Sequence, residues 1–596
     1  MAKCYDNFSR EELIELLNKQ DKELALKKYG LVWDSEKEPE KVVLDCENNL
    51  PILQRISDKE IKTDNSDYNI LIEGDNFHAL SVLNYTHKGK IDVIYIDPPY
   101  NTGNKDFKYN DSYVDKEDGY RHSKWLNFME KRLNLAKNLL KEEGIIFISI
   151  DDNEQANLKL ICDKIFGENN QVAILPTVMN LKGNQDEFGF AGTHEYTFVY
   201  AINKSSCHIG EFKIEDDEIN DWDIDEKGYF KKGANLVASG VNAPREKRPN
   251  LFYPVFLKDN KIFLPATDEV RHLYDRTEKK FNDEILKNLI DKYKNNGYIA
   301  VLPISNNNYM SWRWQLETMQ IRKDTDIIIN NTSLYKKQRP ELSDLPSKKP
   351  KTIFYKPEYS SGNGTNRLKE LFGSKIFNNP KPVELIKDLV YLGGNRNITV
   401  LDFTAGSGTT ADAIIQLNKE DMGKRKFILC TNNENNICTE VCYPRIEKVI
   451  NGYNKNGNGE FIEGLGGNLQ YFKTAYIENS ENIEQLKVNL TYKCTEMLCL
   501  KENIYNLKEE KEDYKIFESN KKDKYLCVYY NFINDSFEVF IDTLKQIDGE
   551  KIIYMFSMDD NINSELFEDI DNFKIETIPQ KILDIYKKII KENVRG

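Results

Sequence analysis

Short apolar segments alternate with amphipathic ones in two stretches of the chain, residues 66–205 and 371–455. The apolar segments YNILIEGD, KIDVIYIDPPY, IIFISID, ITVLDFTAGSG and KFILCTNNEN predict strands. Between them, the spacing of apolar residues predicts helices in NFHALSVLNYT, SKWLNFMEKRLNLAKNLLKEEG, EQANLKLICDKIFG, PVELIKDLVYLGG and TTADAIIQLNK. Wholly apolar strands between such helices are typical of a parallel sheet covered on both faces. The pattern therefore predicts an α/β core built from two separated stretches.

Three other stretches break this alternation. Residues 1–65 predict a charged helical extension, with NFSREELIELLNKQDKELALKKYG as its main helix. Residues 206–370 are irregular and rich in Pro, Asn and basic residues, which favours an inserted domain. The segment NGYNKNGNGEFIEGLGGN is typical of a flexible connection, and strand-helix alternation returns in residues 470–596. We therefore expect an interrupted core followed by a small C-terminal α/β domain.

Composition limits the class of protein. A chain of 596 residues exceeds one compact core, so two to four domains are expected. No run approaches the roughly 20 apolar residues of a transmembrane helix, and the first residues lack the apolar core of a signal peptide. The ten cysteines form no CxxC pair and have no metal-ligand spacing. We expect a cytoplasmic protein with reduced buried thiols, no membrane contact and no metal.

The net charge of −14 at pH 7 would by itself disfavour a nucleic-acid partner. DNA binding depends on a local basic surface, however, and not on the charge of the whole chain. Two basic stretches, APREKRPN and LYKKQRPELSDLPSKKPKTIFYKPEY, lie within residues 206–370, and acidic residues gather in other segments. Net charge therefore decides little about the partner.

The predicted strand IDVIYI stops at Asp97-Pro98-Pro99-Tyr100. Prolines cannot donate to a sheet ladder, and the first also favours extended geometry at Asp97. An exocyclic amine on a base is a poor nucleophile because its lone pair is delocalised into the ring. The Asp97 carboxylate and the Pro98 carbonyl could accept its two N–H bonds and hold the nitrogen pyramidal, while Tyr100 stacks on the base. The motif therefore predicts methyl transfer to a base amine rather than a mere strand terminator.

A second motif, ITVLDFTAGSGTTADAIIQLN, predicts a strand, a glycine turn and a helix. Gly406 and Gly408 would let the backbone approach a ligand where a side chain would block it. The free N–H groups at the start of the helix could then bind a polar or anionic group. Many purely structural turns look similar, and no GK[ST] follows as in a P-loop. The turn is therefore a candidate ligand site.

Two acidic residues follow other predicted strands. Glu434 lies where doubly wound folds place the acid that holds ribose hydroxyls, although Asn432 or Asn433 could serve instead, or Glu434 could be a solvated acid. Asp75 stands between a strand and a helix. There it could cap the helix, which is worth about 1 kcal/mol, or accept from an adenine amino group, and the residue alone favours the cap.

The DPPY motif and the FTAGSG turn together resemble the amino-methyltransferases of DNA that use S-adenosylmethionine. DPPY precedes the turn, an order that resembles the circularly permuted β group with its target-recognition domain between the motifs. LIEGDNFHALSVLNYTHKGKIDVIYIDPPYNTGNKDFKYND, RHSKWLNFMEKRL, IIFISIDDNEQ, FNNPKPVELIKDL and TNNENN resemble the modification (Mod) subunit of Type III restriction-modification systems. The resemblance covers roughly residues 25–205 and 365–450.

The resemblance implies a Rossmann-like S-adenosylmethionine-dependent methyltransferase fold, circularly permuted, with target recognition in residues 206–370. It implies that Asp97, Pro98, Pro99 and Tyr100 carry catalysis. The residues that it places at the cofactor are Asp75, Asp402, Phe403, Thr404, Ala405, Gly406, Ser407, Gly408, Thr409 and Glu434. Among these, Asp75 would hold the adenine and Glu434 the ribose. Lys381 and Pro382 would flank the methionine end.

The implied reaction is methyl transfer to the N6 amino group of adenine in double-stranded DNA, by base flipping. Asp97 favours adenine, because the cytosine N4 enzymes of this group more often carry Ser there. Mod subunits act as homodimers and pair with an ATP-dependent restriction (Res) subunit. This chain shows no Walker A pattern and no nuclease constellation, so it is not expected to cut DNA by itself. The acidic C-terminal domain is a candidate surface for dimerisation or partner docking.

Three alternatives stay open at this point. The chain could be an orphan DNA adenine methyltransferase without a nuclease partner. It could be an RNA or protein amino-methyltransferase of related fold, although the long basic insertion disfavours this. It could also be a DNA-reading subunit whose cofactor pocket only stabilises the fold, which the intact motifs disfavour.

Overall fold

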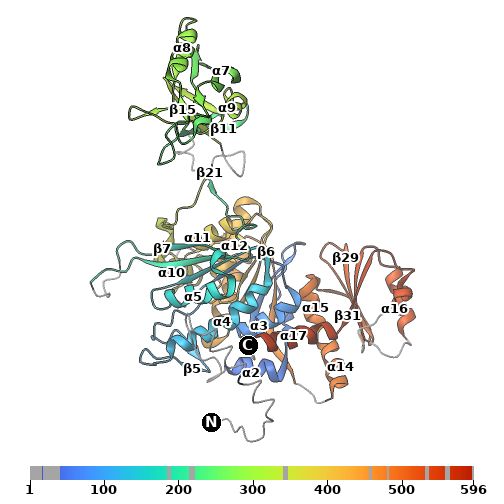
Figure 1. Ribbon diagram of the computed structural model, residues 1–596. Coiled ribbons are helices and arrows are strands. Elements are labelled where there is room, and N and C mark those ends of the chain that lie inside the picture. The colour runs from blue at the N-terminus through green and yellow to red at the C-terminus, as the bar shows by residue number, and fades with distance from the viewer. Residues whose placement is uncertain are drawn as a thin grey trace. The chain divides into compact units, whose positions relative to one another are not determined.

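The computed structural model describes Leu17 and residues 40–183, 189–213, 222–339, 347–455, 459–478, 482–530, 536–557 and 564–593. The helix predicted near the N-terminus, apart from Leu17, lies outside the described residues. The chain forms two compact units, which can be followed in Figure 1. Unit 1 comprises residues 1–210 and 351–596, and unit 2 comprises residues 211–350.

A nine-stranded sheet with the order β1-β26-β2-β23-β22-β3-β6-β8-β7 forms the centre of unit 1. Its strands are β1 (Asn49–Arg55), β2 (Tyr68–Glu73), β3 (Ile91–Ile96), β6 (Leu140–Ile150), β7 (Gln171–Val178), β8 (His194–Ala201), β22 (Thr399–Asp402), β23 (Lys426–Thr431) and β26 (Asn468–Glu478). Neighbours from β26 to β6 run parallel. Towards the two ends of the sheet, β1 pairs antiparallel with β26, and β8 pairs antiparallel with both β6 and the edge strand β7. The prediction of a parallel sheet is therefore confirmed for the centre and wrong at both edges.

The connections between the central strands are mostly helical. They include α3 (Asn76–Thr86), α4 (Arg121–Leu139), α5 (Gln155–Phe166), α11 (Val383–Gly393), α12 (Thr409–Asp421) and α13 (Tyr443–Asn451). Helices α3, α4 and α5 pack in series, as do α11, α12 and α13 (Figure 1). The central strands are buried on both faces, and Ile94 and Leu401, for example, are 0% exposed. Because both faces are buried, the sequence of each strand is a continuous apolar run.

One predicted helix is too long. We expected it to run to Gly144, but α4 ends at Leu139 and β6 begins at Leu140. Leu140 lies opposite Ile91 and Ile145 lies opposite Val93, so the polar KEEG segment forms an irregularity within β6. The charged residues that suggested a last helical turn are instead an interruption of the strand.

Two strands of the sheet come from segments expected outside the core. β1 pairs with β26 from Asn49 opposite Glu478 to Arg55 opposite Phe472. The expectation of a wholly helical N-terminal extension is therefore wrong for residues 49–55. β26 pairs in turn with β2, so the glycine-rich segment that we interpreted as a connection leads into a core strand. NLPILQR contains Pro51, which disfavours a strand and explains why its strand character was missed.

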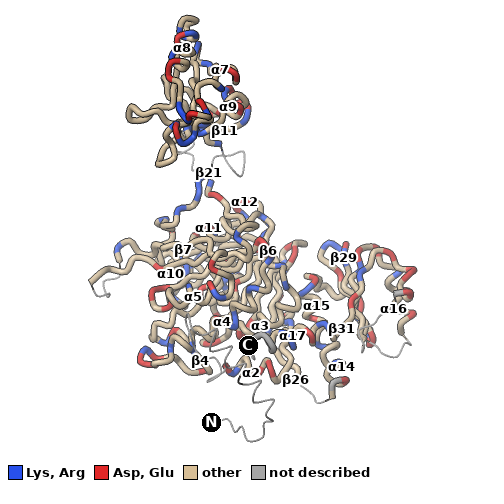
Figure 2. The backbone as a smooth tube through the Cα atoms, in the orientation of Figure 1, with Lys and Arg blue, Asp and Glu red and all other residues tan. Residues whose placement is uncertain are grey.

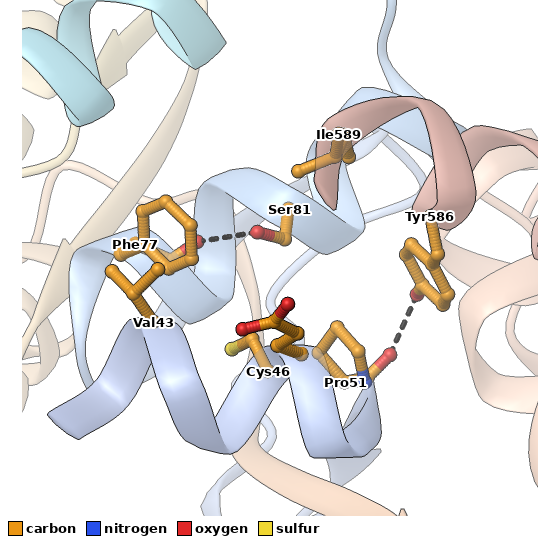
Figure 3. Close-up of a pocket in the computed structure, with 8 residues that line it drawn as sticks. Val43, Cys46, Pro51, Phe77, Ser81, Tyr586 and Ile589 are labelled. Atoms are coloured by element: carbon orange, nitrogen blue, oxygen red, sulfur yellow. Dashed lines mark hydrogen bonds between the residues drawn. The ribbon is translucent and has the colours of Figure 1, made fainter. Parts of the chain in front are cut away.

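The C-terminal part of unit 1 carries a second sheet with the order β27-β28-β29-β30-β31. Its elements are α14 (Ile483–Lys493), α15 (Thr495–Glu502), β27 (Asn506–Glu510), β28 (Tyr514–Glu518), β29 (Lys524–Tyr529), α16 (Phe537–Lys545), β30 (Glu550–Phe556), β31 (Phe573–Ile578) and α17 (Gln580–Asn593). Helix α17 packs against α3 and α4. Figure 3 shows a small pocket there, where the Tyr586 hydroxyl donates to the Pro51 carbonyl at 2.6 Å. Cys46 of α2 (Lys41–Asn48) lines the same pocket. The C-terminal helix is thus anchored on the first strand of the core.

Unit 2 has a core of its own. A four-stranded sheet comprises β10 (Asp223–Asp225), β11 (Gly228–Asn235), β20 (Ser333–Gln338) and β19 (Ile327–Asn330), and a three-stranded sheet comprises β13 (Lys261–Phe263), β12 (Val255–Lys258) and β16 (Ile299–Val301). Trp312 and Tyr253 are fully buried in the main apolar cluster. The chain enters and leaves the unit through the paired strands β9 (Phe212–Lys213) and β21 (Ser347–Lys348). Across the described part of both units, no helix has the length and apolar character needed to cross a membrane.

Leu53 tests whether β1 belongs to the folding core of unit 1. Leu53 is fully buried, whereas Gln54 on the same strand is exposed. Leu53→Ala should lower the free energy of unfolding by about 2–5 kcal/mol, because it leaves a cavity in the core. Gln54→Ala is the matched control and should change that free energy by less than about 0.5 kcal/mol. Urea denaturation followed by circular dichroism measures both, and equal effects would contradict the placement of β1.

Candidate active site

The parallel order β2-β23-β22-β3 brings the carboxyl ends of four strands to one edge of the sheet. Asp97 follows β3, the glycine turn follows β22, Glu434 follows β23 and Asp75 follows β2. The two motifs touch directly, because the Asp97 N–H donates to Thr404 Oγ1 at 2.9 Å. Residues some three hundred positions apart thus form one site, at the edge where open α/β sheets bind ligands.

The DPPY segment is held from behind by buried groups. Trp125 of α4 donates its indole N–H to the Pro99 carbonyl at 2.7 Å. Asn101 has a φ of +57°, and its amide donates to Glu154 Oε1 at 2.5 Å and to the Arg121 carbonyl at 3.2 Å. Trp125, Asn101 and Glu154 are each 0% exposed. None of these supports was predicted, because each depends on tertiary contacts.

Lys381 lies against the DPPY side chains. Its Nζ donates to Tyr100 Oη at 2.6 Å and to Glu195 Oε2 at 2.9 Å, and lies 3.2 Å from Asp97 Oδ1. The Tyr100 hydroxyl also donates to Glu195 Oε2 at 3.1 Å. Sequence reasoning missed Glu195, although an acidic residue at the start of the apolar strand HEYTFVYA was a signal. We expected Lys381 to flank the methionine end of a cofactor, whereas the structure places its ammonium at Asp97.

Burial controls the ionisation of this cluster. Burial raises the pKa of Glu195, the Lys381 ammonium opposes this shift and the Asp97 carboxylate adds to it. Burial also raises the pKa of the Tyr100 hydroxyl well above its usual range, with the carboxylates of Asp97 and Glu195 adding to it. Burial alone would lower the pKa of Lys381, but the two carboxylates outweigh it and the net shift is upward. Lys381 is therefore a cation and Tyr100 a neutral phenol.

The glycine turn has the backbone conformation that its sequence predicts. Gly406 has a φ of +49° and Gly408 a φ of +77°, both in the left-handed region. A Cβ atom at Gly408 would lie 3.0 Å from Cys442 Sγ. Asp402 fixes the start of the turn by accepting from Thr410 Oγ1 at 2.6 Å and from the Thr404 N–H at 3.0 Å. Burial raises the pKa of Asp402 to about 7.

The remaining turn residues are covered or held within unit 1. Phe403 and Ala405 are buried, and the Ala405 N–H donates to the Cys430 carbonyl at 3.0 Å. Ser407 and Thr409 are buried as well, and the hydroxyls of both accept from Arg445. The turn is thus a rigid element, with its backbone facing the sheet edge and its side chains fixed by the protein.

A buried charge cluster supports the turn. Arg445 donates to Thr409 Oγ1 at 2.9 Å and to Ser407 Oγ at 3.2 Å, and its Nη2 donates to Asp412 Oδ2 at 3.0 Å. Asp412 also accepts from Arg367 Nε at 3.0 Å. Burial opposes ionisation of Asp412, but the two guanidinium groups outweigh it and lower its pKa to about 2. Sequence reasoning missed this cluster, and the signal for it was a carboxylate on a buried helix face.

The structure gives the two outlying acids different surroundings. Asp75 caps α3 by accepting from the Phe77 N–H at 2.7 Å, so the cap interpretation is confirmed, and its contact with adenine stays a prediction. Glu434 begins the short helix η5 (Glu434–Asn436) and accepts from Lys108 Nζ at 2.8 Å. Asn433 Oδ1 accepts from the backbone N–H and the hydroxyl of Thr439. Its carbonyl is therefore already used within the protein.

Several basic residues of unit 2 form ion pairs within the protein. Arg245 is 9% exposed, packs against aromatic rings and donates to Asp283 Oδ1 at 2.7 Å. Lys337 and Arg339 both donate to Asp225. Figure 2 shows Lys and Arg interleaved with Asp and Glu on both units. These stretches therefore supply fewer free cations than the sequence suggested.

A family model described as a DNA methylase matches residues 91–441, more than half of the chain. The chain belongs to this DNA methylase family. Among similar proteins, the Type III restriction-modification enzyme EcoPI Mod subunit of Escherichia phage P1 is 39% identical over 463 residues, which are 72% of this chain and 68% of that protein. The Type II methyltransferase M.KpnI of Klebsiella pneumoniae is 33% identical over 373 residues, which are 62% of this chain and 82% of that protein.

Solved structures are similar at a lower level. The PvuII DNA methyltransferase (cytosine-N4-specific) covers 65% of this DNA methylase and 94% of its own chain, with a TM-score of 0.31 and 9% identity. A DNA modification methylase from Thermus thermophilus covers 68% of this chain and 99% of its own chain, with a TM-score of 0.29 and 11% identity. These scores are low, so the fold assignment rests on the observed sheet order and on the family membership.

Asp412 gives a pH-dependent test of the support behind the turn. Asp412→Asn should lower the free energy of unfolding by about 3–5 kcal/mol at neutral pH, because it leaves the fully buried Arg445 guanidinium without a carboxylate. The pKa of Asp412 falls on folding from 3.8 to about 2, so its stabilisation is complete above the unfolded value and is lost as the pH falls through the folded one. The difference between wild type and variant should therefore shrink between these two pH values.

The matched control for this test is Asp542→Asn. Asp542 is 71% exposed and lies 3.9 Å from Lys545. This substitution should change the free energy of unfolding by less than about 0.5 kcal/mol. Urea denaturation at a series of pH values measures both variants. A pH-independent loss in Asp412→Asn would contradict an ionised Asp412 in the folded DNA methylase.

Proposed function

We propose that this chain transfers a methyl group from S-adenosylmethionine to the N6 amino group of adenine in double-stranded DNA, as a modification subunit of the Type III kind. The observation that carries this proposal is the contact between the two motifs, in which Asp97 N–H donates to Thr404 Oγ1 at 2.9 Å. That contact sets a base-amine motif beside a ligand turn, in a member of a DNA methylase family. The similarity to the EcoPI Mod subunit supports the choice of system.

The turn residues fit S-adenosylmethionine. Gly406 and Gly408 are left-handed, which lets the turn take a conformation that other residues rarely adopt, and a Cβ at Gly408 would crowd the buried Cys442 Sγ. The N-terminus of α12 offers free N–H groups to a carboxylate such as that of the methionine part. The residues proposed to hold this part are Asp402, Phe403, Thr404, Ala405, Gly406, Ser407, Gly408 and Thr409. When bound, the cofactor supplies an electrophilic methyl group on a sulfonium.

Two acids are proposed to hold the nucleoside part of the cofactor. Glu434 would accept from the ribose hydroxyls while sharing its carboxylate with Lys108. Their side chains are 38% and 28% exposed, so this ion pair is screened and costs little to rearrange. Asp75 caps α3 and would accept in addition from the adenine amino group of the cofactor. A carboxylate has enough acceptor sites for both roles.

The DPPY residues are proposed to act on the target amine. The Asp97 carboxylate and the Pro98 carbonyl accept the two N6–H bonds, which withdraws the nitrogen lone pair from the ring and aims it at the methyl group. Tyr100 stacks on the face of the extruded adenine. The bond from Trp125 to the Pro99 carbonyl keeps the loop rigid while the base enters. The residues thus hold and orient the amine, and they need no covalent intermediate.

Unit 2 is proposed to read the DNA sequence. It occupies the interval between the two motifs and folds around its own core. The phosphate backbone would be bound by Lys and Arg that are not paired internally, so affinity for DNA should depend on salt. We further propose a homodimer and a restriction (Res) subunit as partners, on the family resemblance alone. The C-terminal five-stranded sheet of unit 1 is the candidate docking surface.

The activity is tested with tritium-labelled S-adenosylmethionine and duplex DNA. Wild type should label the DNA, and nucleoside analysis should find the label in N6-methyladenine. Asp97→Ala should lose at least about 100-fold in kcat, because the amine is no longer held in line. Label in N4-methylcytosine, in RNA or in protein would contradict the proposal, and retained activity in Asp97→Ala would remove the role of that carboxylate.

The turn is tested with a pair of glycine variants. Gly408→Ala should weaken binding of S-adenosylmethionine at least about tenfold, equivalent to ~1.4 kcal/mol, because the new Cβ shifts the turn. Gly89→Ala is the matched control, since Gly89 has a φ of +64° with no atom within 4 Å of the added Cβ. It carries the same backbone strain away from the site, so cofactor affinity should not change. Isothermal titration calorimetry measures both, and equal affinities would contradict the turn as the cofactor site.

A further inference from the structure

A buried lysine joins three acidic or phenolic groups beside DPPY. The Lys381 ammonium has three N–H bonds and three oxygen neighbours, which are Tyr100 Oη at 2.6 Å, Glu195 Oε2 at 2.9 Å and Asp97 Oδ1 at 3.2 Å. The side chains of Lys381 and Glu195 are 10% and 12% exposed. Glu195 Oε1 is buried and accepts no hydrogen bond among the described residues. The Lys381 ammonium is therefore the cation shared by the two carboxylates and the phenol.

Such a cluster is a costly way to fill a protein interior. Two carboxylates and one ammonium must be desolvated, and apolar side chains of the same volume would often be as stable or more so. The strands and helices around it do not need it, because β3 and β8 carry fully buried apolar residues of their own, such as Ile96 and Phe198. What the cluster does contact is the pair of side chains that the proposed function places on the target base, Asp97 and Tyr100.

Resting on the proposed function, we propose that Lys381 and Glu195 are positioning residues of the target-base pocket. Lys381 holds the Asp97 carboxylate and the Tyr100 hydroxyl in the places where they meet the adenine, and Glu195 holds Lys381. Lys381 and Glu195 come from distant parts of the chain, so the pocket forms only when β8 and the segment before α11 are in place. Their role differs from that of the glycine turn, because they act on the base side and not on the cofactor.

The charges of this cluster predict what happens when Lys381 is removed. Asp97 and Glu195 would then share a buried site without their cation, and Tyr95, Tyr100 and Asp402, which also face it, are acids or phenols. Two like charges in one buried site do not both stay ionised, and the pair takes up a proton at a higher pH. Burial already raises the pKa of Glu195, and Lys381 is the cation that opposes this shift, so the proton goes to Glu195. Once Lys381 is gone, Glu195 has no cation left to hold, and its own removal should add little.

The experiment compares wild type, Lys381→Met, Glu195→Gln and the double variant Lys381→Met/Glu195→Gln in the full chain. Lys381→Met should lower kcat about 100-fold at neutral pH, since the held geometry is lost. The double variant should be about as active as Lys381→Met, whereas additivity would predict a further loss, because Glu195 acts through Lys381. Affinities for S-adenosylmethionine and for DNA should not change in any variant.

Surface and charge-conserving variants complete the set. Lys164 and Glu130 form an ion pair at 2.7 Å in which Lys164 is 61% exposed, and Lys164→Met with Glu130→Gln should leave activity and its pH profile unchanged. Lys381→Arg keeps the positive charge between Asp97 and Glu195, so it should retain more of kcat than Lys381→Met. If Lys381→Met does not fold, Lys381→Arg and Glu195→Gln still test the proposal, because Glu195→Gln removes the anchor of Lys381 and should lower kcat without changing cofactor affinity.

Two results would overturn the proposal. The first is additivity of the two substitutions, so that the double variant loses more kcat than Lys381→Met. The second is a loss of cofactor affinity in Lys381→Met, which would mean that Lys381 binds the methionine end of the cofactor instead. Absence of methyl transfer by wild type would instead reject the proposed function. In that case the same four proteins are compared by urea denaturation across pH, where a free energy of coupling between Lys381 and Glu195 that does not depend on pH would overturn the charge pairing itself.

Discussion

The parallel pairing of β22 with β3 is the constraint on which the rest of the site depends. Val400 lies opposite Val93 and Leu401 opposite Ile94, so both strands end at the same edge. Only this register lets the Asp97 N–H donate to Thr404 Oγ1 at 2.9 Å. The DPPY loop and the glycine turn, far apart in sequence, are thereby set side by side. A shift of one residue would turn the side chains of the strand to the opposite face and separate the two motifs.

The site is built on rigid supports that lie behind it. The Asp412–Arg445 pair holds the glycine turn from within, and Trp125 and Asn101 hold the DPPY loop. Buried charges and amides of this kind stabilise little in net terms, but they have one satisfied arrangement, and departing from it leaves a polar group unpaired. Such supports suit a reaction in which the protein orients an amine and a methyl group and otherwise does no covalent chemistry.

Local patterns were enough to predict the elements that form the candidate site. The strand before DPPY, the turn with Gly406 and Gly408 and the helix after it were all found from the sequence, because each is a short run with its own apolar period and breakers. The strand β1 was not found because Pro51 disfavours a strand, and the antiparallel pairing of β8 and β7 was not found because strand direction depends on how segments pack. The sequence also did not predict the roles of Glu195 and Asp412 or the neighbours of Lys381. The ion pairs of these residues form only when distant segments pack together.

A crystal structure of this chain with an S-adenosylmethionine analogue and a duplex that carries its methylated sequence would show directly whether the DPPY loop binds the target adenine. We expect an adenine rotated out of the duplex, with N6 at hydrogen-bond distance from Asp97 and from the Pro98 carbonyl. Tyr100 would stack on the base, and the cofactor would lie on the Asp402 to Thr409 turn. An adenine that stays paired in the duplex, or a cofactor bound away from that turn, would contradict it.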